Sequence, residues 1–216
     1  MRYEHLKNFE NINDFTRGVL PKREGKLGEL EEQCREMGLP IIKPETVAFL
    51  KTVLSSLKPK RILEIGTCVG FSSLFMLSIC KDAKIVTIDR YKYMIDRAKV
   101  NFKEFDAEKS ITLIEGQATD ILENMKGEFD FVFLDAAKAQ YPFFYPNCMR
   151  LLAKNGVFIA DNVLASGIVA DPTRASRRDM TTVKRLSEFI KMSLNDPLTA
   201  SSLLPFADGI IYSVKL

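Results

Sequence analysis

Short apolar runs alternate with longer stretches of helical periodicity along most of the chain. Consecutive apolar residues in a short run are typical of strands buried on both faces, whereas apolar residues three and four apart predict amphipathic helices. The predicted strands are Ile62–Ile65, Lys84–Ile88, Ile111–Glu115, Phe129–Leu134 and Gly156–Ala160. The helices predicted before and between them are Glu45–Leu57, Phe71–Cys80, Tyr91–Phe105 and Tyr141–Leu152. This alternation predicts an α/β fold with a mostly parallel sheet and helices on both faces.

The C-terminal part departs from this alternation. Asp171–Leu194 begins as a basic loop and then becomes helical. Thr199–Leu204 and Ile210–Lys215 are strand-like runs joined by a short turn, so they predict an antiparallel hairpin. With the hairpin added to the five parallel strands, we expect a sheet of seven strands.

Two more helices are predicted ahead of this core. Residues 3–20 carry apolar side chains at helical spacing, and Pro21 ends the helix. Glu24–Met37 is the second. We expect residues 1–58 to form a helical segment that either caps the ligand site or pairs two subunits. Residues 59–216 would form the core of a single structural domain.

The composition narrows the class of protein. The chain has 216 residues, 46% hydrophobic and 27% charged, as is ordinary for a soluble globular protein, and its net charge of +3 does not by itself indicate a nucleic-acid partner. Four cysteines without a C-x-x-C pair predict reduced thiols and a cytoplasmic location. No run is long enough to span a membrane. A single histidine, His5, argues against histidine-based nucleophilic catalysis and His-rich zinc sites.

A glycine turn follows the first predicted strand. Gly66 and Gly70 bracket the turn, where glycine tolerates positive φ and lets a ligand approach the backbone closely. The pattern is neither G-x-G-x-x-G nor a P-loop. Ser72 or Ser73 is expected to cap the helix that follows. The alternative is an ordinary strand–turn–helix connection that binds no ligand.

Two carboxylates accompany this turn. Glu64 lies at the strand end, where it would repel a pyrophosphate but would suit a ligand with a cationic end, such as the amino group of S-adenosylmethionine. Asp89 ends the second strand about 20 residues beyond the turn, where nucleotide-binding folds place a carboxylate on a ribose. These positions favour a nucleoside ligand with a positively charged group.

Polar residues recur at the C-terminal ends of the predicted strands, where open α/β sheets bind ligands. Besides Glu64 and Asp89, Asp135 and the pair Asp161-Asn162 occupy such ends. Asp135, Asp161 and Asn162 offer only oxygen ligands, which hard divalent ions such as Mg²⁺ or Mn²⁺ prefer. The alternative is strand-end capping, in which these side chains satisfy loop amides.

Lys138 stands three residues after Asp135. If a helical turn begins there, both side chains face the same way. A lysine beside a metal loses its proton more easily, so Lys138 could accept a proton from a hydroxyl group. The alternative is a surface lysine without a role.

Four stretches together resemble the metal-dependent class I O-methyltransferases, which include catechol and caffeoyl-CoA O-methyltransferases. They are Leu63–Thr67, Thr87–Asp89, Leu134–Lys138 and Ala160–Leu164. The resemblance covers nearly the whole chain and implies a Rossmann-like methyltransferase fold that binds S-adenosylmethionine. It implies a metal held by Asp135, Asp161 and Asn162, with Lys138 as the catalytic lysine. The cofactor contacts that it implies are Ile42, Glu64, Gly66, Ser72, Asp89, Gln117 and Asp135; relatives often carry Asp at the Gln117 position.

A narrower resemblance points to bacterial tRNA 5-hydroxyuridine methyltransferases, which form 5-methoxyuridine at the wobble position. It rests on Pro40–Ile42, Asp135–Tyr141, Asp161–Gly167 and the segment from Arg174 to Arg185. We therefore expect the tRNA anticodon loop as substrate, with phosphates attracted to basic residues near the metal. These residues are Arg174, Arg177, Arg178, Lys184 and Arg185. The alternative is a small-molecule methyltransferase that uses the same site for catechol-like phenols. A third hypothesis is a non-catalytic binding module. The resemblance also implies a homodimer.

Overall fold

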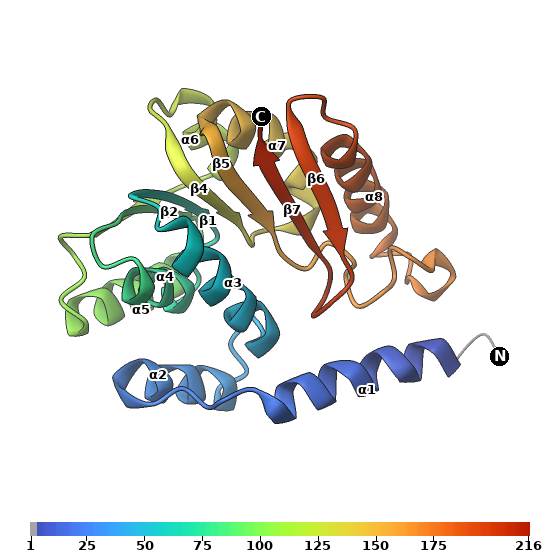
Figure 1. The fold of residues 1–216 in the computed structure, drawn as a ribbon, viewed down its shortest axis with the longest axis horizontal. Helices are drawn as coiled ribbons and strands as arrows, with labels where there is room; N and C mark the ends of the chain where they lie inside the picture. Colours follow the sequence, from blue (N-terminus) through green and yellow to red (C-terminus); the bar gives the residue numbers. More distant parts are fainter. Residues whose placement is uncertain (1–3) are drawn as a thin grey trace.

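The structure is a computed structural model that describes the backbone of residues 4–216 and the side chains of residues 11–216. Tyr3, where the first predicted helix begins, and the side chain of His5 lie outside the described part. The centre of the fold is a seven-stranded sheet in the order β3-β2-β1-β4-β5-β7-β6 (Figure 1). The strands are β1 (Arg61–Ile65), β2 (Lys84–Asp89), β3 (Ile111–Glu115), β4 (Phe129–Leu134), β5 (Leu152–Ala160), β6 (Thr199–Leu204) and β7 (Ile210–Lys215).

The sheet confirms the predicted topology. Strands β1 to β5 pair in parallel, and β7 pairs antiparallel with both β5 and β6. The helices are α1 (Glu4–Val19), α2 (Gly25–Glu36), α3 (Pro44–Leu57), α4 (Phe71–Ile79), α5 (Lys92–Glu104), α6 (Ala118–Asn124), α7 (Tyr141–Leu151) and α8 (Met180–Leu194). Two short 3₁₀ turns, η1 (Lys138–Gln140) and η2 (Pro172–Arg174), complete the regular structure.

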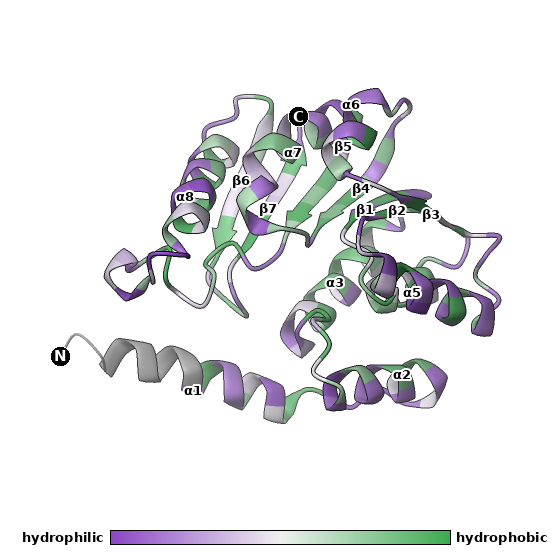
Figure 2. Cartoon of the chain, turned by 180° about the vertical axis from the view of Figure 1, so that it is seen from behind, coloured by the Kyte–Doolittle hydropathy of each residue, from purple (hydrophilic) through white to green (hydrophobic). Residues whose placement is uncertain are grey.

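Each strand sends alternate side chains into two separate cores, one on either face of the sheet. Ile62 and Phe133 belong to the core that α3, α4 and α5 cover, whereas Leu63 and Val132 belong to the core beneath α6, α7 and α8. All four side chains have no exposed surface. A strand buried on both faces must be apolar at every position, which explains the continuous apolar runs of the sequence. Figure 2 shows mainly the hydrophobic colour on the central strands, whereas the helices carry both the hydrophobic and the hydrophilic colour.

Two elements differ from the predictions. Strand β5 begins at Leu152, directly after α7, and not at Gly156, because Leu152 pairs with Phe129 before the register shifts along β4. The helix α6 was not predicted. It has only seven residues, too few for a helical period to be recognised.

The N-terminal helices α1 and α2 lie along the lower side of the molecule in Figure 1, and α3 leads from them to the sheet. Helix α1 leaves Ile12, Phe15 and Val19 largely exposed, at 60%, 71% and 62%. The division of the chain at residue 58 and the homodimer both stay predictions. Among residues 4–216, no helix is long and apolar enough to cross a membrane.

Candidate functional site

A cavity of about 890 Å³ opens at the C-terminal ends of the parallel strands. This is the sheet edge at which open α/β folds bind ligands. Most of the predicted site residues line it, namely Ile42, Gly66, Ser72, Asp89, Gln117, Asp135, Lys138 and Asn162. Glu64 and Asp161 are fully buried and do not line the cavity. The residues that line it come from segments far apart in the sequence, so the fold assembles the site.

The glycine turn after β1 brings the cavity wall close to β4. Gly66 has φ of +108°, and a Cβ atom at this position would lie 2.0 Å from the backbone oxygen of Asp135. Gly70 has φ of +82°, and a Cβ atom there would lie 2.5 Å from the Phe102 ring. Both glycines are therefore required by close approach as well as by their backbone conformation.

Glu64 is the centre of a buried hydroxyl network under this turn. Its carboxylate accepts hydrogen bonds from Ser72 and Ser73, and from Thr87 at 2.6 Å. The prediction that one of the serines caps α4 is therefore wrong; Gly70 is the N-cap residue, and no side chain caps it. Burial raises the pKa of Glu64 from 4.5 to about 7, although the three hydroxyls act in the opposite direction. Because Ser72 lines the cavity and Glu64 does not, Glu64 contacts the cavity through that hydroxyl.

Asp89 connects the glycine turn to the end of β2. One carboxylate oxygen accepts a hydrogen bond from the backbone N–H of Cys68 at 2.8 Å, and the other accepts bonds from the N–H groups of Arg90 and Tyr91. A carboxylate has about four lone-pair positions, so these three hydrogen bonds leave at least one free, and Asp89 lines the cavity. Beside it, the Arg90 guanidinium donates to the side-chain oxygen of Gln117 at 3.1 Å.

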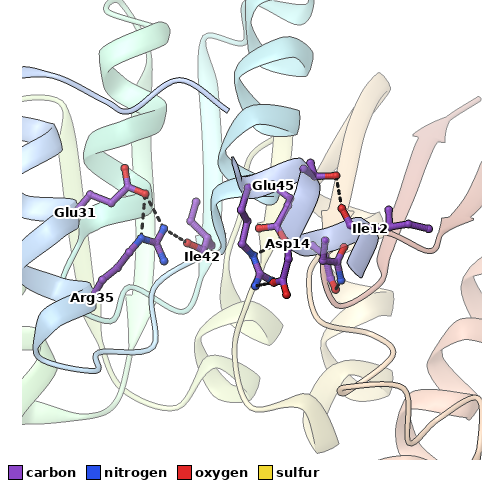
Figure 3. A network of polar contacts seen from close by, with 10 residues as sticks. Ile12, Asp14, Glu31, Arg35, Ile42 and Glu45 are labelled. Carbon is purple, nitrogen blue, oxygen red and sulfur yellow. Dashed lines mark hydrogen bonds and ion pairs between the residues drawn. The ribbon is translucent and has the colours of Figure 1, made fainter. Parts of the chain in front are cut away.

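Ile42, at the other side of the cavity, is held by the N-terminal helices. Figure 3 shows Arg35 of α2 placed between Glu31 and the backbone oxygen of Ile42, to which it donates at 3.0 Å. At the start of α3, Glu45 accepts a hydrogen bond from Arg17 of α1 at 2.8 Å. The segment 40–43 thus has a defined position on the cavity wall because both helices contact it or its neighbours.

The predicted metal ligands meet at the ends of β4 and β5. These strands are neighbours, and the backbone N–H of Asp161 donates to Leu134, the residue before Asp135, at 3.0 Å. Asp161 has no exposed surface. Burial, together with the nearby charge of Asp135, raises the pKa of Asp161 to about 7, and burial likewise raises the pKa of Asp135. The positive charge of Lys138, in η1, lowers the pKa of both carboxyl groups, so Lys138 lies near both of them.

The donor set fits a hard divalent cation. One Asp161 oxygen accepts the N–H of Asn162 at 2.7 Å, as strand-end capping predicts, but the other, Oδ2, is buried without a hydrogen-bond partner in the described part of the chain. Two buried carboxylates that are both ionised, one with an unpartnered oxygen, are unfavourable, and a cation between them would relieve both the repulsion and the missing partner. Among residues 11–216 there is no cluster of three His, Cys, Asp or Glu side chains that could hold a metal. The third predicted ligand, Asn162, is an amide and is not one of these residue types.

The loop after β5 is held by the turn between the hairpin strands. The N–H of Val163 donates to Gly209 at 3.0 Å, and the N–H of Leu164 donates to the backbone oxygen of Asp208 at 2.9 Å. The Asp208 carboxylate also accepts the N–H of Ser166. Asn162 has φ of +57°, a left-handed conformation that these contacts maintain. The 205–209 turn therefore fixes the loop that carries Asn162.

The five predicted nucleic-acid residues lie outside the cavity wall. The Arg174 guanidinium lies beside Gly167, where a Cβ atom would be 3.3 Å from its Nη1 atom, and the neighbouring Ser166 lines the cavity. Arg185 lies over the Phe143 ring at 4.5 Å and 3.7 Å from Glu188. The nucleic-acid role of all five residues stays a prediction.

Several residues that line the cavity were missed by sequence reasoning, among them Lys43, Arg90, Ser166 and Asp208. Arg90 directly follows a predicted strand end, so its position was a usable signal. Asp208 lies in the turn of the predicted hairpin, but only the packing of that turn against the loop after β5 brings it to the cavity.

Known proteins resemble this chain in sequence and in fold. The sequence model of a family described as O-methyltransferase matches residues 25–216. The protein named "Probable caffeoyl-CoA O-methyltransferase 2" from Dictyostelium discoideum is 30% identical over 84% of this chain and 80% of its own length. A catechol O-methyltransferase from Niastella koreensis is 28% identical over 76% of this chain and 77% of its own length. The crystal structure of an O-methyltransferase from Bacillus cereus in complex with SAH superposes with a TM-score of 0.82, at 25% identity, covering 98% of this chain and all of that one (100%).

Proposed function

This chain belongs to the O-methyltransferase family and is an S-adenosylmethionine-dependent enzyme, and we propose that it methylates a phenolic hydroxyl of a small, catechol-like molecule with the help of a divalent cation. The observation that carries the proposal is the position of Asp135, Asn162 and Lys138 on the cavity wall, with Asp161 buried beside Asp135, while Asp89 and Gln117 line the same cavity beyond β1, on the side of β2 and β3. The names of the relatives from Dictyostelium and Niastella support this class of substrate.

The size and lining of the cavity support a small substrate beside the methyl donor. Ligand cavities commonly measure about 300–1,000 Å³, and this one lies near the upper limit at about 890 Å³. Phe144 and Gln140 line it near Lys138, so an aromatic ring would meet both an apolar and a polar group. A phenol needs both.

We propose that the cofactor lies along the glycine turn. Asp89 would accept hydrogen bonds from the ribose hydroxyls. Ser72, oriented by Glu64, would hold the methionine end together with Gly66 and the segment at Ile42. Gln117, held by Arg90, would lie beside the adenine.

Asp135, Asp161 and Asn162 would hold the cation. A cation there supplies positive charge that favours the ionised form of the substrate hydroxyl. Lys138 would accept the hydroxyl proton on its Nζ atom. The remaining contribution of the chain is alignment of the substrate oxygen with the methyl group, which in favourable cases lowers a barrier by about 7–11 kcal/mol.

The test is a methyl-transfer assay with a series of phenols, with and without a chelator, on the wild type and on Asp161→Asn. We expect turnover of catechols in Mg²⁺ or Mn²⁺, loss of turnover in the chelator and in the variant, and retained affinity for S-adenosylhomocysteine in both. Full activity in the chelator would refute the cation role, and failure on every phenol would refute the substrate class.

A tRNA containing 5-hydroxyuridine is the second candidate substrate. The specific observation in its favour is the position of Arg174 beside Gly167, at the edge of the loop that carries Asn162. An exposed Phe143 under the Arg185 guanidinium adds a surface on which an unstacked base could lie. Nucleoside analysis of tRNA from cells with and without the protein separates the two candidates. Loss of 5-methoxyuridine would favour tRNA, and an unchanged nucleoside profile would favour the small phenol.

A further inference from the structure

Three buried side-chain oxygens in the described part of the chain have no hydrogen-bond partner. They are Oε2 of Glu45, Oγ1 of Thr46 and Oδ2 of Asp161. Glu45 and Thr46 are consecutive at the start of α3, and Asp161 directly follows β5. Buried polar atoms are nearly always paired, so such a group needs an explanation, commonly a water or an ion.

Thr46 lies beside Asp161, although the two residues are 115 positions apart in the sequence. The Thr46 hydroxyl is close enough to the Asp161 carboxylate to lower the pKa of that group. Neither Oγ1 of Thr46 nor Oδ2 of Asp161 has a partner at ordinary hydrogen-bond geometry, so the two side chains are neighbours without a hydrogen bond between them. Both residues have no exposed surface.

The usual structural role of a helical threonine does not account for Thr46. A threonine in a helix commonly donates to the backbone oxygen four residues earlier. Thr52, on the same helix, does so with Ala48 at 3.2 Å. Thr46 is the third residue of α3, so the residue four positions earlier, Ile42, precedes the helix, and its backbone oxygen accepts a hydrogen bond from Arg35. Thr46 therefore does not make the helical hydrogen bond that Thr52 makes, and its hydroxyl stays without a partner beside Asp161.

We propose that Thr46 is a positioning residue for the cation site, a role that rests on the proposed function of Asp161 as a cation ligand. A carboxylate must be fixed in rotation to present an oxygen to a cation, and the Asn162 N–H holds only one side of the Asp161 carboxylate. The Thr46 hydroxyl, which lies beside Oδ2, would hold the other side by donating to it and would leave the remaining lone pairs for the cation. Partners of this kind orient metal ligands, and their loss commonly lowers metal affinity by roughly 10–100-fold.

The position of Thr46 depends on the N-terminal helices. Arg17 of α1 holds Glu45, and Arg35 of α2 holds Ile42, so residues on both sides of the segment 43–44 are anchored. The first helical turn of α3 then carries the Thr46 hydroxyl to the end of β5. In this way the N-terminal segment contributes to the acceptor end of the site.

The experiment compares four variants of the full chain, Thr46→Val, Thr46→Ala, Thr46→Ser and Thr52→Val. Mn²⁺ affinity is measured by electron paramagnetic resonance, S-adenosylhomocysteine affinity by calorimetry without metal, and the Mg²⁺ dependence of turnover by initial rates. We expect Thr46→Val to weaken Mn²⁺ binding by roughly 10–100-fold and to raise the KM for Mg²⁺, with kcat largely restored at saturating Mg²⁺. Thr46→Ser and the exposed control Thr52→Val should bind Mn²⁺ like the wild type, and S-adenosylhomocysteine affinity should not change.

The outcomes separate the two proposals. Wild-type Mn²⁺ affinity in Thr46→Val would overturn the role of Thr46 while leaving the cation site intact. A wild type that binds no Mn²⁺ would overturn the cation site itself and, with it, this inference. If Thr46→Val does not fold, the Mn²⁺ affinity of Thr46→Ala is compared with that of the wild type instead. Thr46→Ala also lacks the hydroxyl, and its side chain is smaller. A loss of kcat without a change in Mn²⁺ affinity would count against positioning, because it indicates general damage.

Discussion

The hydroxyl of Tyr141 donates a hydrogen bond to the backbone oxygen of Asp161 across 3.0 Å. The same hydroxyl lies 3.4 Å from the backbone oxygen of Leu134. Tyr141 has no exposed surface, and burial raises the pKa of its hydroxyl well above 10, so it stays protonated and donates at every physiological pH. One buried side chain thus joins the ends of β4 and β5, from which the two predicted carboxylate ligands come.

Tyr141→Phe should lower the free energy of unfolding by about 1–2 kcal/mol, because a buried backbone oxygen loses its donor while the ring still fills its space. Urea unfolding of the two proteins measures the difference. Tyr93→Phe is the matched control, since Tyr93 is 64% exposed and should lose little stability. Equal stability of Tyr141→Phe and the wild type would contradict this account of the strand ends.

Asp89→Asn should weaken S-adenosylhomocysteine binding about 10–100-fold, because charge-assisted hydrogen bonds contribute about 1.5–3 kcal/mol. Calorimetric titration of the variant measures the change. Asp96→Asn is the control; its carboxylate lies on exposed α5 and pairs with Lys92. Normal affinity in Asp89→Asn would count against the ribose contact. Because Asp89 also binds the Cys68 N–H, its thermal unfolding should be recorded in parallel.

Lys138→Met should reduce kcat by roughly 10²–10⁴-fold if the lysine accepts the substrate proton, with little change in the affinity for Mn²⁺ or S-adenosylhomocysteine. Lys138→Arg keeps the positive charge but cannot serve as a base, so it should be impaired as well. Lys154→Met, an exposed lysine on β5, is the control. Activity of Lys138→Arg near that of the wild type would indicate that charge, and not proton transfer, is what the position supplies.

Glu64 should make stability depend on pH. Its folded pKa of about 7 lies above the ordinary 4.5, so the folded state binds the proton more tightly than the unfolded state. The free energy of unfolding should therefore fall as pH rises from about 4.5 to about 7, by about 3 kcal/mol from this group. Glu64→Gln should remove that part of the slope, as urea unfolding at pH 5, 6, 7 and 8 in a chelator would measure. Parallel curves for the variant and the wild type would show that Glu64 does not titrate in this range.

The fold was predictable because the central parallel strands are buried on both faces and carry mostly apolar residues. Ile62 and Leu63 serve different cores, yet both must be hydrophobic, so the sequence records a strand but not which core each residue joins. The positions of Asp89 and Asp135 at the site followed from the same reasoning, since parallel strands end at one edge of the sheet.

What could not be predicted depends on contacts between distant segments. Ser72 and Ser73 lie in the first turn of α4, and only the buried position of Glu64 explains why their hydroxyls donate to its carboxylate and do not cap the helix. Thr46 has no neighbour in sequence that indicates its proximity to Asp161. Asp208 reaches the cavity because the hairpin turn packs against the loop after β5.

The two parts of the proposed site therefore depend on different parts of the sheet. The groups proposed to bind the nucleoside lie at the ends of β1, β2 and β3, whereas the loop with Asn162 depends on the turn between β6 and β7. Exchanging residues 205–209 for those of a relative should therefore change which hydroxyl-bearing substrate is methylated. The affinity for the methyl donor should stay the same.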